Sequence, residues 1–218
     1  MKRVILTLTA IIFTSLPLSA QQKFKHELYV GGSFGMTFSY VSFMPRVQHG
    51  FLRGYSFGGT ILWNTEKNLG LLAEINFSQQ GWKESFPDDP QYHYERRTNY
   101  VEIPFLTHIH FGGKHVKAFI NLGPKIGFFL NESTSENLNG AKPNSTNIQH
   151  YLYVEKYIDW GLCGGPGIEF RTPIGNFQLE GRYYYALGNI YNSRKQDPFS
   201  KSAYQIMSAK ITYLFRIK

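Results

Sequence analysis

The feature that most constrains the fold is a two-residue alternation of apolar and polar side chains that recurs along the chain. In residues 177–187 the odd positions are apolar or glycine, whereas the even positions include Glu180 and Arg182. The same alternation runs through residues 101–111 and 207–217. Because successive side chains of a β-strand point to opposite faces, this pattern predicts strands with one apolar and one polar face.

About eight such segments can be counted along the chain. They lie at residues 27–40, 55–65, 70–83, 97–111, 115–130, 155–171, 175–189 and 202–218. Aromatic residues make up 17% of the sequence and favour strands. After residue 20, no stretch approaches the ~20 apolar residues that a membrane helix needs. The sequence therefore predicts an all-β fold, and an even number of long strands is what a closed antiparallel barrel requires.

The connections between the predicted strands alternate between short and long. The short turns lie at residues 66–68, 112–114 and 172–174, and the long polar links lie at 42–54, 84–96, 131–154 and 191–201. Outer-membrane barrels have this alternation, with tight turns in the periplasm and long loops outside the cell. We therefore predict a single antiparallel up-and-down transmembrane β-barrel of about eight strands, with short periplasmic turns and long external loops.

Aromatic residues near the ends of the predicted strands suggest where the membrane interfaces lie. The residues concerned are Trp63, Trp82, Tyr100, Phe111, Trp160 and Tyr213. Membrane barrels carry girdles of aromatic side chains at both interfaces, so we expect these side chains to face the lipid. Strands are rich in aromatic residues in any setting, which makes this pattern less specific than the alternating connections.

The first 20 residues predict an export signal. A basic tip and the apolar run at residues 4–13 precede a small residue, Ala20. This order is typical of a cleaved secretory signal peptide, and the apolar run is too short for a membrane-spanning helix. The expected domains are therefore a signal peptide at 1–20 and an outer-membrane β-barrel domain at 21–218, located in the cell outer membrane.

The charge distribution narrows the range of partners. Removal of Lys2 and Arg3 with the signal lowers the formal charge from +8 to +6. The remaining basic residues are scattered rather than arranged in a stripe, so nucleic acid is not an expected partner, whereas anionic lipid or polysaccharide suits such a surface. The single cysteine, Cys163, cannot form an internal disulfide. No cofactor is expected.

Several sequence runs resemble the PorT-like outer-membrane β-barrel proteins of Bacteroidetes. The runs are residues 77–81, 99–106, 122–127, 161–170 and 182–185, and the most specific part is 100–106 followed by Gly123 and Pro124. The resemblance spans nearly the whole chain after residue 20 and implies a small barrel similar to OmpX or OmpA. Because PorT itself is associated with the type IX secretion system, the resemblance also raises protein secretion as a hypothesis.

A set of charged residues falls on the strand face opposite the aliphatic residues. The set is Glu74, Glu102, Lys125, Glu169, Glu180, Arg182 and Lys210. An eight-stranded barrel is just wide enough for side chains to fill its interior. We expect these acids and bases to form a lumen charge network of salt bridges and hydrogen bonds. An ion path or proton relay is the alternative interpretation.

Other patterns give little support to catalysis or metal binding. His108 and His110 lie on one face of a predicted strand and His115 follows a turn, but no cysteine or carboxylate completes a ligand set at an obvious spacing. The glycine-rich residues 161–167 lack the lysine of a phosphate-binding loop and continue as a strand, so we interpret these glycines as sites of close packing. No catalytic residue and no metal site is predicted.

The function predicted from the sequence is a non-catalytic barrel that presents external loops for surface recognition. The link at residues 131–154 is the main candidate, because Tyr151, Tyr153 and Tyr157 lie at its exit. Expected partners are outer-membrane lipid and lipopolysaccharide around the barrel, and a surface protein or glycan at the loops. The alternatives are a PorT-like component of type IX secretion, an outer-membrane enzyme, and a soluble periplasmic lipocalin-like ligand-binding barrel with its faces inverted.

Overall fold

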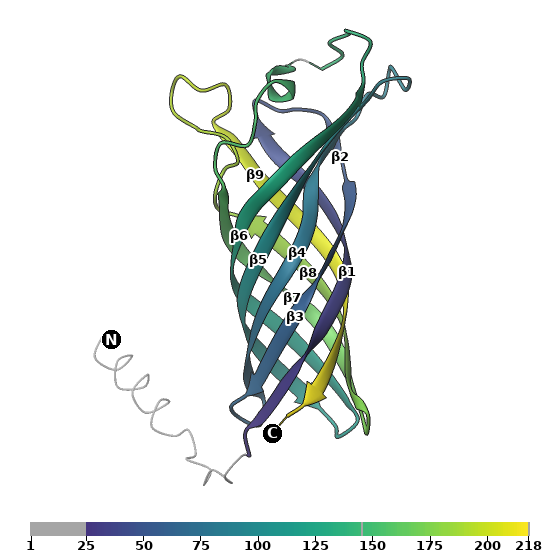
Figure 1. The fold of residues 1–218 in the computed structure, drawn as a ribbon, viewed down its shortest axis with the longest axis vertical. Coiled ribbons are helices and arrows are strands. Elements are labelled where there is room, and N and C mark those ends of the chain that lie inside the picture. The colour runs from purple at the N-terminus through teal and green to yellow at the C-terminus, as the bar shows by residue number, and fades with distance from the viewer. Residues whose placement is uncertain (1–24, 145, 218) are drawn as a thin grey trace, which may run out of the picture.

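The computed structural model describes residues 25–144 and 146–217, and its long strands close into one antiparallel barrel (Figure 1). The long strands are β1 (Glu27–Met44), β3 (Leu52–Asn64), β4 (Leu69–Glu84), β5 (His93–Gly112), β6 (Val116–Asn137), β7 (Ile158–Thr172), β8 (Gly175–Ala186) and β9 (Lys201–Arg216). Strand β2 (His49–Gly50) adds two residues beside the end of β4. A short 3-10 helix, η1 (Ile148–His150), lies between β6 and β7. The predicted signal peptide at 1–20 lies outside the described residues.

Each long strand pairs with its neighbours in sequence, and β1 pairs with β9 to close the ring. The up-and-down topology confirms the predicted fold class. Within the described residues every long strand pairs with a neighbour on each side. A closed sheet of this kind suits a solvent that cannot satisfy backbone groups. Figure 1 shows the short turns and the start of β1 at one end of the barrel, called here the turn end, and the long connections at the other, the loop end. No helix in the described part of the chain is long and apolar enough to cross a membrane.

Several strands extend further toward the loop end than the sequence predicted. Strand β1 reaches Met44, β3 already begins at Leu52, β5 begins at His93 and β6 continues to Asn137. A strand needs about 9–11 residues to cross a bilayer, so these strands continue beyond the membrane. In the extensions of β3, β5 and β6 the outward positions are polar, so the alternation that marks a membrane strand disappears although the backbone pairing continues. The first three long links are correspondingly shorter, at 45–51, 85–92 and 138–157. The fourth, at 187–200, is longer than predicted because β8 already ends at Ala186.

The outer face of the barrel is apolar and the charged side chains are inside. Ile75, Phe105 and Ile211 are between 53% and 59% exposed, whereas Glu74 and Lys210 are only 5% and 4% exposed. A protein in water has the opposite preference, because exposed aliphatic surface and buried charge both cost free energy. The soluble lipocalin-like alternative required aliphatic residues inside and charges in water, and the observed exposure contradicts it.

The loop half of the barrel interior is filled by aromatic side chains. Trp82, Tyr94, Tyr100 and Tyr204 are fully buried there, and the Phe43 ring packs edge-on against Trp82 at a centroid distance of 5.3 Å. The prediction that Trp82 and Tyr100 belong to the lipid-facing girdles is therefore wrong. Both have even numbers, like the inward-facing Glu74 and Glu102 on the same two strands, so the strand alternation decides their direction. The other girdle residues face outward as predicted: Trp63, Phe111, Trp160 and Tyr213.

Glycines in β7 allow neighbouring groups to approach closely, as the sequence indicated. A Cβ atom on Gly167 would lie 2.2 Å from Cζ of Phe119, a ring that is buried in the lumen. A Cβ on Gly165 would lie 1.9 Å from the carbonyl oxygen of Gly181 on β8. A larger residue at either position would displace the ring or the neighbouring strand.

Candidate functional site

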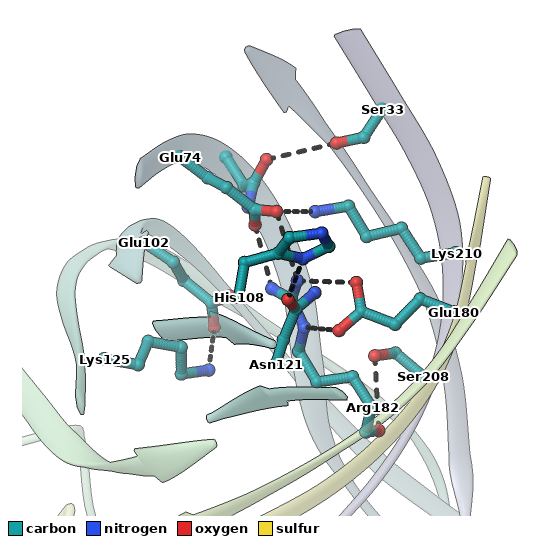
Figure 2. A network of polar contacts seen from close by, with 11 residues as sticks. Ser33, Glu74, Glu102, His108, Asn121, Lys125, Glu180, Arg182, Ser208 and Lys210 are labelled. Atoms are coloured by element: carbon teal, nitrogen blue, oxygen red, sulfur yellow. Dashed lines mark hydrogen bonds and ion pairs between the residues drawn. The ribbon is translucent and has the colours of Figure 1, made fainter. Parts of the chain in front are cut away.

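The centre of the lumen holds a cluster of two carboxylates and two cations from strands on different sides of the barrel (Figure 2). Arg182 on β8 lies between Glu74 and Glu180, and its nitrogens are 2.8 and 3.1 Å from the Glu74 oxygens. Two further bonds of 2.8 Å join Arg182 to Glu180. Lys210 Nζ on β9 lies 2.6 Å from Glu74 Oε1. This paired arrangement is the strongest form of ionic hydrogen bonding available to arginine.

A second ion pair lies beside this cluster. Lys125 Nζ on β6 is 2.5 Å from Glu102 Oε1 on β5. The same ammonium group is 3.5 Å from the centre of the Tyr184 ring, close enough for a cation–π contact. Tyr184 in turn donates a hydrogen bond of 2.7 Å to Asp159. The two ends of this chain of contacts are therefore carboxylates, and the lysine and tyrosine lie between them.

Glu169 forms part of a third cluster, which is nearer the turn end. Its carboxylate is 2.6 Å from Arg171 Nε and accepts a hydrogen bond of 2.6 Å from Gln178. Arg171 reaches across the barrel to Glu27, at 3.2 Å. Glu27 also accepts a hydrogen bond of 3.0 Å from the hydroxyl group of Tyr29. Arg171 thus lies between the carboxylates of Glu169 and Glu27, so each of these three side chains contacts a group of opposite charge.

The seven residues predicted as a lumen charge network thus all face the interior but form three groups. Sequence reasoning omitted Arg171 and Glu27, although Arg171 has the same strand parity as Glu169 and could have been found from it. Asp159 was omitted for a different reason. It begins a strand at the end of a long link, where the alternation has not yet been established. The alternation predicted the direction of each side chain, but not which residues from different strands would meet.

The space left among these groups is small. A cavity of about 30 Å³ lies between the central cluster and the Lys125 ion pair, and Cys163, Asn76 and Ser208 also line it. A water molecule needs a cavity of roughly 10–15 Å³ on this measure, so the cavity has room for about two waters. It has no room for a sugar or an amino acid. The chemistry of the lumen is therefore that of a packed polar core.

The histidine pair is also buried in the lumen. His108 Nδ1 is 2.7 Å from the Asn121 side-chain oxygen, and His110 Nε2 is 3.0 Å from the carbonyl oxygen of Lys67. His115 is exposed in the turn after β5. In the described part of the chain, no group of three or more His, Cys, Asp or Glu side chains could hold a metal ion. The histidines instead connect β5 to β6 and to the β3–β4 turn.

At the loop end, Arg96 holds the segment 138–157 against the mouth of the barrel. The arginine is buried and points inward from β5. It donates hydrogen bonds to the carbonyl oxygens of His150, at 3.0 Å, and Leu152. Its guanidinium group also lies 5.4 Å from the centre of the Trp82 ring. One buried cation therefore joins the aromatic layer of the lumen to the backbone of the external segment.

Glu84 anchors the same segment from the end of β4. Its carboxylate accepts hydrogen bonds from the side chains of Asn144, Gln149 at 2.9 Å and His150 at 2.8 Å. The His150 ring also stacks on Tyr94 with a centroid distance of 3.9 Å. Sequence reasoning placed Glu84 and Arg96 at the ends of a loop and did not assign them a role. Their inward direction depends on the strand extensions, which the sequence did not reveal.

The anchored segment leaves three tyrosines exposed. Tyr151, Tyr153 and Tyr157 are 73%, 79% and 63% exposed. A cavity of about 340 Å³ borders Tyr151 and Tyr153 and is also lined by Glu136 and Thr134. Tyrosine combines a large apolar ring with a polar hydroxyl group and is common in recognition surfaces. The arrangement therefore presents aromatic contact area beside hydrogen-bonding groups, on a segment that the barrel holds in place.

The closed ring, the apolar outer face and the filled polar lumen define an integral β-barrel of the outer-membrane type. A family model described as outer membrane protein beta-barrel domain matches residues 19–192, and the chain belongs to this family. Membership supports a location in the outer membrane. The narrower PorT-like resemblance stays a prediction. A search of curated protein sequences found no match to the chain.

Solved structures with similar folds include three small outer-membrane barrels. Ail of Yersinia pestis, in complex with the heparin analogue sucrose octasulfate, shares 14% identity over 87% of this chain and 99% of that chain, with a TM-score of 0.42. Neisserial surface protein A shares 14% identity over 88% of this chain and 100% of that chain, with a TM-score of 0.43. Outer membrane protein W of E. coli shares 10% identity over 89% and 100% of the two chains, with a TM-score of 0.40.

Proposed function

We propose that this protein is a non-catalytic outer-membrane barrel that displays the segment 138–157 for recognition of a surface protein or glycan. The observation that carries the proposal is the contrast within that segment. Its backbone and polar side chains are tied to Arg96 and Glu84, while Tyr151, Tyr153 and Tyr157 remain exposed. A segment that is held in place loses less conformational entropy on binding than a free one.

The packed lumen supports display rather than transport. The ion pairs around Arg182, the aromatic layer around Trp82 and the anchored segment follow one another from the centre of the barrel to its loop end. In this proposal the charged groups stabilise a rigid interior and do not form an ion path. The purified protein in a planar bilayer should give no stepwise ionic current. A steady, cation- or anion-selective current would favour the ion-path interpretation instead.

The proposal also covers cleavage of the signal peptide, the orientation of the barrel in the membrane and the lipid around it. Residues 1–20 would be cleaved as a signal peptide, and residues 21–218 would form the membrane domain. The turn end would face the periplasm and the loop end the exterior, as in other barrels with short and long connections. Outer-membrane lipid and lipopolysaccharide would surround the apolar face.

Recognition by the tyrosines can be tested on cells that display the protein. Cells producing the wild type are screened against glycans and surface proteins, and the screen is repeated with the triple variant Y151A/Y153A/Y157A. We expect the triple variant to lose a ligand that the wild type binds, because it loses most of the exposed aromatic area. Tyr92→Ala changes a tyrosine in the neighbouring link 85–92 and is the matched control. Equal binding by the wild type and the triple variant would contradict the proposal.

The PorT-like resemblance supports a second candidate, a role in type IX protein secretion. Deletion of the gene should then reduce the amount of cargo proteins in the culture medium. Substitution of Tyr151, Tyr153 and Tyr157 alone should leave that amount unchanged. An outer-membrane enzyme is the third candidate. In that case the protein should show a hydrolytic activity, and substitution of a serine or aspartate at the rim of the lumen should abolish it.

A further inference from the structure

Basic side chains gather on the outward face of β3, β4 and β5, just beyond the apolar belt. They are Arg53, Lys83 and Arg97, and we call them the outer basic patch. Each lies between two buried neighbours on its strand and therefore points away from the lumen. Arg53 and Lys83 are exposed, and the side chain of Arg97 is 33% exposed. One carboxylate, that of Glu95, lies among these three cations.

The patch lies where the outward face changes from apolar to polar. On β3 the outward residues Phe57 and Tyr55 are followed toward the loop end by Arg53. On β4, Phe77 is followed by Gln79 and, further on, by Lys83. This change marks the depth at which the hydrocarbon of a bilayer ends and the headgroups begin. The patch is therefore at headgroup depth at the loop end of the barrel.

Hydrogen bonds hold Arg97, the central cation of the patch, in a fixed arrangement. Arg97 Nε is 3.0 Å from Glu95, and its Nη1 donates bonds of 3.1 Å to the Gln79 side chain and to the carbonyl oxygen of Arg53. The row continues around the barrel, because Gln79 donates to Asn99 and Asn99 donates to Asn131 over 2.7 Å. Amide and guanidinium groups thus form a polar row across β4, β5 and β6.

The strands that follow β3 around the ring on its other side differ at the same end. There the outward positions of β1, β8 and β9 hold Tyr40, Tyr183 and Gln205, and both tyrosine hydroxyl groups donate to Gln205 at 2.6 Å. This side offers aromatic groups and one cation, Lys201, whose Nζ donates to the Tyr185 hydroxyl group at 3.3 Å. With three cations on β3, β4 and β5, the positive charge at headgroup depth is denser at the outer basic patch, which suits an anionic ligand there.

We propose that the outer basic patch binds the phosphorylated saccharide headgroup of lipopolysaccharide. This inference rests on the proposed function in one respect, because it requires the loop end to face the exterior. Arginine forms forked hydrogen bonds with phosphate, and lysine adds a positive charge. The amides of Asn99 and Asn131 lie beside the arginine and can donate to and accept from sugar hydroxyl groups. The acyl chains of the same molecule would lie along Tyr55, Phe57 and Phe77 below.

The test measures binding of lipid A to the full chain refolded in phosphatidylcholine nanodiscs. Fluorescent lipid A is used with its phosphates and after their removal, with the wild type and the variant R53Q/K83Q/R97Q. At about 1 kcal/mol for each cation near a charged membrane, the triple variant should bind phosphorylated lipid A about 100-fold more weakly. Dephosphorylated lipid A should bind weakly and equally to both. The matched control is K114Q/R194Q/K195Q, which removes the same number of positive charges from turns and links outside the patch.

The outcomes separate this inference from the proposed function. Equal affinity of the wild type and the patch variant for phosphorylated lipid A would overturn the inference, and so would an equal loss in the control variant. Binding of a soluble protein, but not of lipid A, to the patch would overturn it in favour of a protein partner. Heat-dependent gel mobility confirms that each variant has folded. If the triple variant does not fold, Lys83→Gln alone should weaken binding about fivefold. Failure of the tyrosine test would leave these results unaffected.

Discussion

At the scale of single residues, the lumen depends on the correct pairing of buried charges. Glu74 contacts both Arg182 and Lys210, whereas Arg182 also has Glu180 as a partner. A buried ion pair need not stabilise a protein more than apolar residues of the same size would. Removal of one partner is nevertheless costly, because the other charge is left buried and uncompensated. The consequence of a substitution therefore depends on how many partners the remaining residues keep.

Glu74→Ala should lower the free energy of unfolding by about 3–5 kcal/mol, because Lys210 loses its ion pair and Arg182 keeps only Glu180. Urea unfolding of the refolded protein in lipid vesicles, followed by tryptophan fluorescence, measures the change. Adding Lys210→Met to the Glu74→Ala variant should recover part of the loss. Glu66→Ala, in the exposed β3–β4 turn, should change stability by no more than about 0.5 kcal/mol. A similar small change for Glu74→Ala would show that the central cluster is not important for stability.

The outward face permits a second test at this scale, in which the same residue is introduced at two depths. Ile75→Arg places a charge within the apolar section of β4 and should cost about 2–4 kcal/mol. Ser133→Arg places it beyond the belt, next to Arg97 in the β5–β6 pairing, and should cost about 0–1 kcal/mol. Unfolding in vesicles measures both. If the two costs are equal, the apolar belt does not mark the position of the bilayer.

At the scale of elements, strand extensions and the external segment 138–157 form one unit. The inward residues Glu84 and Arg96 lie where β4 and β5 project beyond the apolar belt, and both bind the segment. Because the contacts include backbone carbonyl groups of His150 and Leu152, they constrain the path of the chain as well as its side chains. The external segment is therefore held by the barrel and is not an independent loop.

Arg96→Met should release this segment, because the carbonyl groups of His150 and Leu152 would lose their buried donor. Limited proteolysis of the protein in proteoliposomes should then cleave residues 139–147 several-fold faster than in the wild type. Arg194→Met, in the exposed link 187–200, is the control and should leave the cleavage rate unchanged. An unchanged rate in the Arg96→Met variant would mean that other contacts, such as those of Glu84, are sufficient to hold the segment.

At the scale of the whole molecule, the closed ring accounts for the expected resistance to detergent. Every long strand has two neighbours, since β1 pairs with β9 over residues 29–44 and 201–216. A ring without an edge cannot be opened one strand at a time, and its lumen adds ion pairs that join opposite walls. Both features make unfolding cooperative.

Outer-membrane fractions should therefore contain the protein in a heat-modifiable form. Unboiled samples in SDS should migrate differently from boiled ones, because the folded barrel resists SDS until it is heated. The measurement compares the two samples on one gel after separation of outer membranes from the periplasmic fraction. A protein that is found in the periplasmic fraction and shows no shift on boiling would contradict the membrane location and the assignment of the outer face.

Individual residues differ in how far the sequence predicted their positions. The direction of Glu74, Arg182 and Lys210 was predictable from the two-residue alternation, since each lies within a well-marked strand. The directions of Trp82 and Tyr100 were predictable in the same way, but their position near strand ends suggested a girdle instead. The roles of Glu84 and Arg96 were not predictable, because polar strand extensions have no apolar alternation to mark them.

The sequence by itself determined the class of fold, the number of long strands, the alternation of connections and the face on which each residue of the predicted strands lies. These properties follow from local geometry, because a strand repeats every two residues and a turn joins adjacent strands. Only the tertiary structure decided that the lumen charges form three groups, that Arg96 reaches the segment 138–157, and that Arg53, Lys83 and Arg97 share one patch. Such contacts depend on the register between strands and the closure of the ring, which bring together residues far apart in the chain.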